Sequence, residues 1–261
     1  MVRKSSDRTR ISRLKKREIL PVCEGTSGES CPSCPIGQAL HTNKVWPDFL
    51  RERVLQEYEL GSTIFHQGNV VGFVFMLFEG FVKLSINDGI GGHRVIAVHS
   101  ATQSPCMILD PLSLDQAIHS YTCEALSDCR VYCLPKPAFL WFMREEFNLV
   151  KFALSEVSRE LEMFLERAKR EVNTSGRERL AHLLLSLLYI QGPPEGEMHT
   201  ITLPLNRQEL ASMIGVTRET FSRLLRGLTQ SGAIALSEDD MIIIRKLEQL
   251  SKIAGPSQIR N

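Results

Sequence analysis

Two short helical patterns around a glycine dominate residues 203–234, LPLNRQELASMIGVTRETFSRLLRGLTQSGAI. Asn206, with Glu209 three positions later, has the spacing of a capping box, so a first helix is predicted to begin there. Gly215 permits a tight turn, and Thr217 can cap a second helix. The segment therefore predicts a helix-turn-helix.

Each predicted helix has one apolar face, and the second helix also has a polar one. The apolar positions are Leu210, Ala211 and Ile214 in the first helix, Val216 in the turn, and Phe221, Leu224, Leu225 and Leu228 in the second. The polar positions, opposite that stripe and near the N-terminal end of the second helix, are Arg218, Glu219, Ser222 and Arg223. In a helix-turn-helix this end of the second helix meets base edges in the major groove.

These side-chain types suit the edges of DNA bases. Arginine can donate two hydrogen bonds to N7 and O6 of guanine, glutamate can accept one from the cytosine amino group, and serine can hydrogen-bond to a base. Thr217 and Arg207, at the starts of the two predicted helices, are further candidate DNA contacts. Four polar residues alone could form a solvated helix face, but here the caps, the turn and the apolar spacing agree. We therefore expect double-stranded DNA as a partner.

The segments on either side extend the motif. NTSGRERLAHLLLSLLYIQG predicts a helix that Ser175 caps and Gly192 ends. Residues 232–247, GAIALSEDDMIIIRKL, predict a β-hairpin that would add a wing. Its acidic turn would not favour contact with phosphates.

A different pattern occupies residues 54 to 140, where short apolar runs alternate with turn signals that contain glycine. Examples are GFVFMLFEGFVKLSIN and HRVIAVHS. Alternating β-branched and aromatic residues, with turn signals spaced by about ten residues, indicate a β-sandwich or barrel.

Beyond Pro137 the apolar period becomes helical. Apolar residues recur at alternating steps of four and three, at Val150, Leu154, Val157, Leu161, Phe164 and Ala168. This a/d spacing, flanked by charged residues, is typical of a coiled-coil seam. Ala153 and Leu165 widen the apolar face somewhat. We interpret the seam as a homodimer interface.

Composition limits the class of protein and the cellular compartment that can be expected. The chain has 31 basic and 30 acidic side chains, and no apolar run approaches the length of a membrane span. Residues 3–17 are rich in arginine and lysine, which indicates either a solvated tail or an arm that touches phosphates. No secretory signal is apparent, so we expect a cytoplasmic protein without a membrane partner. Its seven cysteines then suggest metal ligands, redox sensors or buried residues rather than disulfides.

Together, the β-domain, the long helix and the winged motif with RQELASMIGVTRETFSRLLRGL resemble the CRP/FNR superfamily of bacterial transcription regulators over about residues 40–250. The resemblance implies an α+β fold with an N-terminal cyclic-nucleotide-binding-like β-barrel (jelly roll), a long dimerisation helix and a C-terminal winged helix-turn-helix. The predicted divisions are a basic, cysteine-containing leader (1–45), an effector-sensing barrel (46–147), a dimerisation helix (148–172) and a DNA-binding domain (173–261).

The resemblance also bears on the ligand and on the DNA site. The family's cyclic-nucleotide pocket carries Gly-Glu and Arg-Ser pairs, and the matching stretch SPCMILDPLSLDQAIHSYTCEAL has neither, so cyclic AMP is not expected to bind. Glu219, Ser222 and Arg223 match the recognition helix of the FNR branch. That match implies a palindromic promoter site with TTGA-type half-sites, and the family implies RNA polymerase as a partner. Arg218, more typical of the CRP branch, leaves the outer bases open.

The stretch CPSCP at residues 31–35 suggests a cofactor. Cysteine thiolates hold iron-sulfur clusters, and the FNR branch binds a 4Fe-4S cluster through N-terminal cysteines and one barrel cysteine. The resemblance therefore implies a cluster on Cys23, Cys31 and Cys34. Cys133 is the first candidate for the fourth ligand; the others are Cys129, Cys106 and Cys123. Leu40 stands where the FNR branch has a further cysteine, and Tyr132 occupies the position expected for the barrel ligand.

Several alternatives remain open for the sensor. The thiols could bind zinc, undergo oxidation or have no sensory role, and a histidine could bind haem. A regulator without a cluster would then respond to thiol oxidation, haem or a small molecule. A thiol-dependent redox enzyme is the remote alternative, because Pro32 and Pro35 in a leader do not match a thioredoxin-like Cys-x-x-Cys at the start of a helix. We expect no enzymatic activity.

Overall fold

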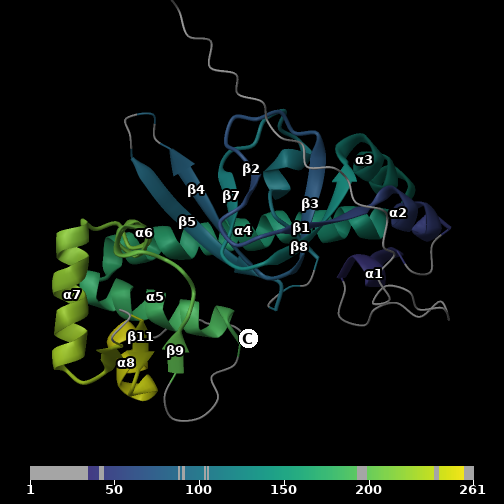
Figure 1. Ribbon diagram of the computed structural model, residues 1–261. Helices are drawn as coiled ribbons and strands as arrows, with labels where there is room; N and C mark the ends of the chain where they lie inside the picture. The colour runs from purple at the N-terminus through teal and green to yellow at the C-terminus, as the bar shows by residue number, and fades with distance from the viewer. Residues whose placement is uncertain are drawn as a thin grey trace, which may run out of the picture.

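The computed structural model describes residues 35–255, apart from 41–43, 88, 90, 91, 103, 105, 193–198 and 238–240. A β-rich domain occupies the N-terminal part, a long helix runs along it, and a helical domain with a small sheet follows (Figure 1). None of the described helices is both long and apolar enough to cross a membrane.

Two four-stranded antiparallel sheets form the N-terminal domain, with strand orders β1-β8-β3-β6 and β2-β7-β4-β5. The strands are β1 (Val54–Tyr58), β2 (Thr63–Phe65), β3 (Phe73–Glu79), β4 (Phe81–Asn87), β5 (His93–Ser100), β6 (Met107–Ile108), β7 (Thr122–Ala125) and β8 (Cys129–Pro135), with a 3-10 turn η1 at Pro111–Leu114. Neighbours in the sheets are often distant in sequence, which is the connectivity of a jelly roll. The predicted jelly-roll-like barrel is thus confirmed.

Alternation along β8 separates two apolar clusters. Val131 and Cys133 point into the barrel interior, between the two sheets. Tyr132 and Leu134 point outward, where they pack against helices. Successive strand residues face opposite sides of a sheet, so a shift of one position moves a side chain from one cluster to the other.

Four helices cover the outer face of the first sheet: α1 (Pro35–Leu40), α2 (Trp46–Glu52), α3 (Lys136–Glu145) and α4 (Phe147–Asn173). Their apolar residues, among them Leu40, Phe142 and Phe152, share one cluster with the outward residues of β3 and β8. A buried carboxylate also joins α4 to the barrel, because Glu156 accepts a hydrogen bond of 3.0 Å from the amide of Ile108.

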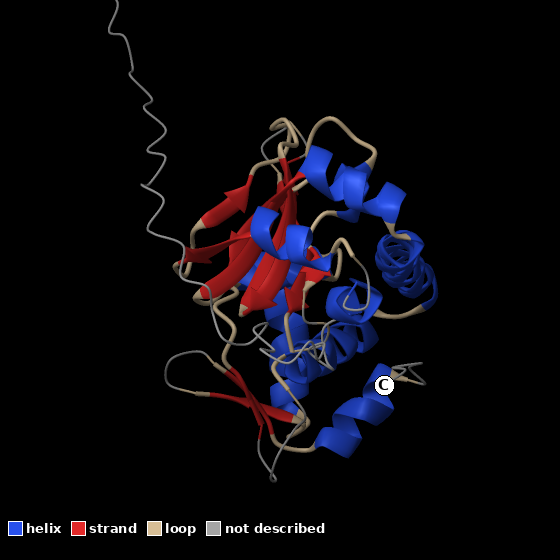
Figure 2. Ribbon diagram, turned by 90° about the vertical axis from the view of Figure 1, so that its right-hand side faces the viewer, coloured by secondary structure: helices blue, strands red, loops and turns tan. Residues whose placement is uncertain are grey.

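The C-terminal domain consists of α5 (Gly176–Ile190), β9 (His199–Ile201), α6 (Arg207–Met213), α7 (Arg218–Gln230), β10 (Ile234–Leu236), β11 (Ile242–Ile244) and α8 (Leu247–Ala254). Its sheet has the order β10-β11-β9 and lies apart from the barrel sheets (Figure 2). The predicted hairpin is confirmed, with Ile234 opposite Ile244. Val98 and Leu126 of the barrel belong to this domain's apolar cluster, so the two domains share a core.

The tight turn between β3 and β4 depends on Gly80, which has φ 96°. A Cβ added there would lie 2.5 Å from the carbonyl oxygen of Asp128 and 2.7 Å from Sγ of Cys129. Gly68, at φ 82°, has open space around the same position. A comparison of alanine substitutions at the two glycines therefore distinguishes the cost of backbone strain from the cost of steric overlap.

We predict that Gly80→Ala destabilises the protein more than Gly68→Ala. Gly68→Ala should cost about 1 to 2 kcal/mol from left-handed strain alone. Gly80→Ala should cost roughly 2 to 5 kcal/mol, because backbone atoms must also move. Urea unfolding monitored by circular dichroism measures both values. Equal losses would contradict the close approach at Gly80.

Candidate nucleic-acid interface and sensor region

The first helix of the motif begins as the sequence predicts. The Asn206 side chain accepts hydrogen bonds from the amides of Gln208 and Glu209, at 2.9 and 3.0 Å. The Glu209 carboxylate in turn accepts from the amide of Asn206, at 2.8 Å. These contacts complete the capping box and satisfy amides that the helix itself leaves unpaired.

The turn and the second helix also match the prediction. Gly215 has φ 67°, a left-handed conformation that side chains disfavour. Thr217 caps α7 by accepting from the amide of Thr220, at 3.2 Å. Phe221, Leu225 and Leu228 are buried, and Leu224 packs partly buried against the same cluster. The polar side of α7 therefore has a fixed orientation.

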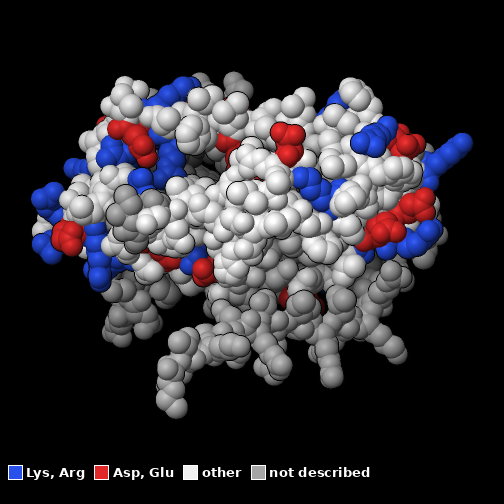
Figure 3. All heavy atoms as spheres, turned by 90° about the horizontal axis from the view of Figure 1, so that it is seen from above, with Lys and Arg blue, Asp and Glu red and all other residues white. Residues whose placement is uncertain are grey.

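That polar side is open to solvent. Arg218, Glu219 and Arg223 are exposed, and Ser222 is half-buried beside them. Hydrogen bonds from its own backbone and from Thr217 lower the pKa of Glu219, which keeps this carboxylate ionised as an acceptor. In Figure 3, lysine and arginine side chains gather at the end of the molecule that carries α6 and α7, on the left of the view.

The remaining candidate DNA contacts lie close to this face. Thr217 is exposed, and Arg207 is half-buried at the start of α6. Arg207 and Arg218 both line a hollow of about 610 Å³ between α6, α7 and the wing. The turn between the two helices has a further support that the sequence did not suggest, because Arg179 of α5 donates 3.0 Å to the carbonyl of Ile214. No local pattern could have indicated a partner so distant along the chain.

In the barrel, the stretch that matches the family's nucleotide cassette contains a buried hydrogen bond between a histidine and an aspartate. His119 Nδ1 lies 2.7 Å from Oδ2 of Asp110, and both side chains are nearly inaccessible. The ring of Phe65 stacks on His119 with centroids 4.1 Å apart. The histidine and the carboxylate thus bind each other, and an aromatic ring covers them.

Polar contacts lead from this pair to α4. The pKa of Tyr121 is raised by burial and by the nearby Asp110 and Glu160 carboxylates. Its hydroxyl donates to the carbonyl of Leu109 and to Oε1 of Glu160, each at 3.2 Å. Burial raises the pKa of Glu160 to about 6. The cassette is therefore in contact with the long helix through hydrogen bonds.

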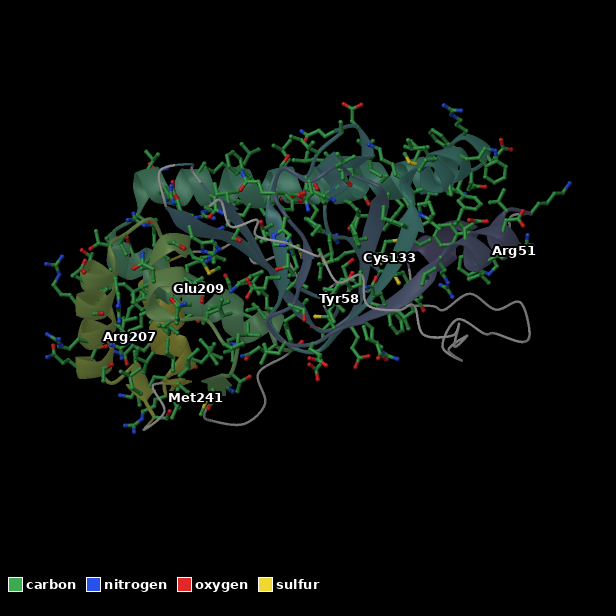
Figure 4. All side chains as sticks on the ribbon, turned by 45° about the horizontal axis from the view of Figure 1, so that its top comes forward. Arg51, Tyr58, Cys133, Arg207, Glu209 and Met241 are labelled. Atoms are coloured by element: carbon green, nitrogen blue, oxygen red, sulfur yellow. The ribbon has the colours of Figure 1, made fainter. Side chains whose placement is uncertain are left out.

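Three of the barrel cysteines face the interior. Cys123, Cys129 and Cys133 are buried in the cluster between the two sheets. Burial raises the pKa of the Cys133 thiol to about 12, and it raises the other two as well. Tyr58 is opposite Cys129 on the neighbouring strand β1, and its side chain also interacts with Cys133 (Figure 4). Such thiols behave as small apolar side chains rather than as thiolates.

Cys106 has a different environment. It lies in the outer cluster with Ile36 and Leu40 of α1 and with residues of α3 and α4. Its φ of 61° makes it the only non-glycine residue with positive φ in the described part of the chain. Such a conformation is costly and is found often at functional sites. Cys106 is thus on the side of the barrel that α1 covers.

Cys23, Cys31 and Cys34, the predicted leader ligands, lie outside the described residues. Within the part of the chain that the structure describes, no group of three or more histidine, cysteine, aspartate or glutamate residues could hold a metal ion. The described residues by themselves therefore do not form a site with three or more ligands.

The predicted seam lies on α4. Leu154, Leu161 and Phe164 are exposed, at 63%, 55% and 67%. Ala168 is also exposed, and Val150 and Val157 are half-buried. The neighbouring face of the same helix is covered by the barrel through residues such as Leu149 and Phe152. One chain thus leaves a row of apolar side chains in contact with solvent.

Two protein families match the chain. The Crp-like helix-turn-helix domain matches residues 178–253, and the cyclic nucleotide-binding domain matches residues 55–146. The first includes α6, α7 and the wing, and the second covers most of the barrel and α3.

Individual relatives span both parts. The chain is 30% identical to the global nitrogen regulator of Synechococcus elongatus, over 70% of this chain and 82% of that protein. It is 24% identical to the transcriptional activator protein FnrL of Cereibacter sphaeroides, over 77% and 80%. The solved structure of a CRP/FNR family transcriptional regulator from Thermus thermophilus matches with a TM-score of 0.65 and 23% identity, over 78% of this chain and 99% of that one. The chain belongs to the CRP/FNR family of DNA-binding transcription regulators, and it is not an enzyme.

The exposed face of α7 generates a prediction for Arg223. Arg223→Ala should weaken binding to a duplex with two TTGA-type half-sites by roughly 1 to 3 kcal/mol per half-site, because a paired arginine–guanine contact is lost. The loss should be confined mainly to one base position, which fluorescence anisotropy with substituted duplexes measures.

Arg51→Ala is a charge-matched control, because Arg51 lies on α2 at the opposite end of the molecule from Arg207 (Figure 4). It should leave affinity nearly unchanged. If Arg223→Ala weakens all sequences equally, Arg223 contacts phosphates instead of a base.

Proposed function

We propose that this regulator acts as a homodimer on palindromic TTGA-type promoter sites and senses oxygen, nitric oxide or redox state through a 4Fe-4S cluster. Cys23, Cys31 and Cys34 are the proposed leader ligands. The observation that carries the sensor assignment is the position of Cys106 in the apolar cluster that also contains α1. A cytoplasmic location and contact with RNA polymerase complete the proposal.

The DNA assignment rests on the exposed face of α7. A carboxylate, a hydroxyl and two guanidinium groups lie near the N-terminal end of a helix whose opposite face is buried. Arg223 and Glu219 can read a guanine and a cytosine edge, and Ser222 between them is only half-exposed. Thr217 and Arg207 flank this face and are suited to contacts with the backbone of the duplex.

Dimerisation through α4 accounts for the row of exposed apolar residues. Leu154, Leu161 and Phe164 lie on one side of the helix, and a second copy of the same helix would remove them from water. A two-fold axis there would pair the recognition helices of two chains with two half-sites of a palindrome.

Cys106 is better placed than Cys133 to be the fourth cluster ligand. Cys34 directly precedes Pro35, where α1 begins, and α1 packs in the same cluster as Cys106. Cys133 points away from that cluster, into the barrel. A ligand must be a thiolate that the leader can reach. We therefore propose Cys106 in place of the sequence-based first candidate.

Bonds between iron and these thiolates would tie the leader to the barrel, and oxygen or nitric oxide would remove them by attacking the iron. Cys106 is two residues before Ile108, whose amide hydrogen-bonds to Glu156 on α4. A change at Cys106 would therefore reach the dimer helix through β6 over a short, buried path. Such a change can shift the population of dimers that are competent to bind DNA.

If the seam on α4 is the dimer interface, a charged residue placed in it should prevent dimerisation. Leu161→Glu should convert the dimer to a monomer at micromolar concentration and reduce DNA affinity, because an unpaired carboxylate would be buried at the interface. Ser155→Glu introduces the same charge at an exposed position on another side of α4 and should remain dimeric. Sedimentation equilibrium distinguishes the two. A dimeric Leu161→Glu variant with parental affinity would show that the seam is not the interface.

Cysteine variants test the cluster. Proteins purified without oxygen should lose iron, sulfide and visible absorption when Cys31 and Cys34 are both changed to serine, and also in Cys106→Ser. Cys133→Ser should retain the parent's iron, since its side chain lies inside the barrel. Circular dichroism checks that each variant is folded.

Two other results are informative. Loss of iron in Cys133→Ser but not in Cys106→Ser would make Cys133 the fourth ligand. A folded parent protein that contains no iron after anaerobic purification would refute the cluster and leave thiol oxidation, haem or another small molecule as the signal.

A further inference from the structure

A buried lysine joins the barrel to the helix-turn-helix. Lys83 of β4 is only 7% exposed, and its Nζ lies 2.6 Å from Oε1 of Glu209 on α6. A second carboxylate, that of Glu124 on the neighbouring strand β7, is 2.9 Å away. Burial lowers the pKa of Lys83, but hydrogen bonds to the two carboxylates outweigh this effect and raise it overall. The ammonium group is therefore charged at the domain interface.

The Glu209 carboxylate makes two structural interactions at the same time. One oxygen accepts from Lys83, and the other accepts from the amide of Asn206 and so completes the capping box of α6. The same carboxylate thus sets the start of the first helix of the motif and fixes that helix to the barrel. This side chain is 8% exposed, so water cannot readily replace either partner.

Other contacts align the same surfaces. β5 is an edge strand, and its outward amide at Val95 donates 3.1 Å to Oγ of Ser212 on α6. Arg167 of α4 donates 2.7 Å to the carbonyl of Ile96 on the same strand. α6 thereby covers the open edge of the barrel sheet, and an exposed edge is otherwise free to pair with other chains.

The ion pair is sensitive to loss of one partner. Removing the lysine would leave a buried carboxylate whose countercharge is gone, which is strongly destabilising for the docked arrangement. Separation of α6 from the barrel would hydrate that carboxylate and relieve the cost. Glu124, at 29% exposure, has access to solvent and does not contact α6 through any hydrogen bond in the described structure.

The docked arrangement leaves the recognition face open. Contacts with the barrel come from α6 and α5, whereas Arg218, Glu219 and Arg223 on α7 remain exposed. Docking therefore does not mask the DNA-binding surface. Its consequence is a defined orientation of α7 relative to the barrel and to α4.

We propose that Lys83 is a positioning residue for DNA binding, which acts through Glu209 to hold the helix-turn-helix in the orientation that a dimer needs to contact both half-sites. Two recognition helices must lie one helical turn of DNA apart. A domain that is released from the barrel adopts this orientation only part of the time, and affinity falls in proportion to that fraction. This inference rests on the proposed DNA-binding mode of the dimer.

Three variants test the proposal. Lys83→Met removes the charge and keeps the apolar stem of the side chain. In Lys83→Met/Glu209→Gln, glutamine retains a hydrogen-bond acceptor for the amide of Asn206 and requires no countercharge. Glu124→Gln is the control, because it removes the other countercharge of Lys83 and leaves the pair with Glu209 intact.

Each protein is measured with and without DNA. Hydrogen exchange of the β5 peptide reports docking in the absence of DNA, since the Val95 amide is bonded to Ser212. Fluorescence anisotropy then gives affinity for the TTGA-type duplex, and sedimentation confirms the dimer. If docking of each chain falls independently to about a tenth, only about a hundredth of the dimers have both domains docked, so affinity should fall about a hundredfold with unchanged base preference.

We expect faster exchange and weaker binding in Lys83→Met, recovery of both in the double variant, and parental values in Glu124→Gln. Unchanged exchange and affinity in Lys83→Met would overturn the proposal. Faster exchange with unchanged or tighter binding would also overturn it, because docking would then be irrelevant or inhibitory. A parent that docks but does not bind the duplex would refute the proposed DNA site, which is a separate failure.

Discussion

Two sides of one helix, α4, carry apolar residues that require apolar partners. The packing of the barrel on one side, and the dimer proposed on the other, both depend on this helix. Leu149 and Phe152 are buried against α1, α3 and the first barrel sheet, whereas Leu154 and Leu161 remain in solvent. The covered side makes the helix part of the barrel. The open side is best satisfied by a second copy of the same helix. Any change in the packing of the covered side can therefore alter the geometry of a dimer formed through the open one.

Buried polar contacts join the barrel to α4 at one place and to the helix-turn-helix at another. Near the start of β6, Ile108 and Glu156 connect the surroundings of Cys106 to α4. Near β4, Lys83 and Glu209 connect the barrel to the motif that carries α7. A buried charged group that loses its partner is costly. Each contact therefore favours the arrangement in which the two elements are packed together over arrangements in which they are separated. We propose that an altered bond at the outer cluster shifts the position of the recognition helix.

Local patterns in the sequence predicted the parts that depend on neighbours in the chain. The capping box of Asn206 and Glu209 and the turn at Gly215 follow from spacings of a few residues. The facing of Cys133 could not be predicted with the same certainty, because a shift of one position in a strand reverses it. Lys83 and Glu209 are 126 positions apart, and a lysine within an apolar strand gives no indication of its partner. The barrel and the helix-turn-helix were therefore predictable, whereas the contacts between them were not.

We propose that an iron-sulfur cluster controls the arrangement of these domains. Protein grown with ⁵⁷Fe and purified without oxygen should give the Mössbauer spectrum of one 4Fe-4S cluster per chain. The same sample should change its affinity for the TTGA-type duplex when air or nitric oxide removes that spectrum. A folded, dimeric sample without cluster iron, or one whose DNA affinity is the same before and after cluster loss, would contradict the account.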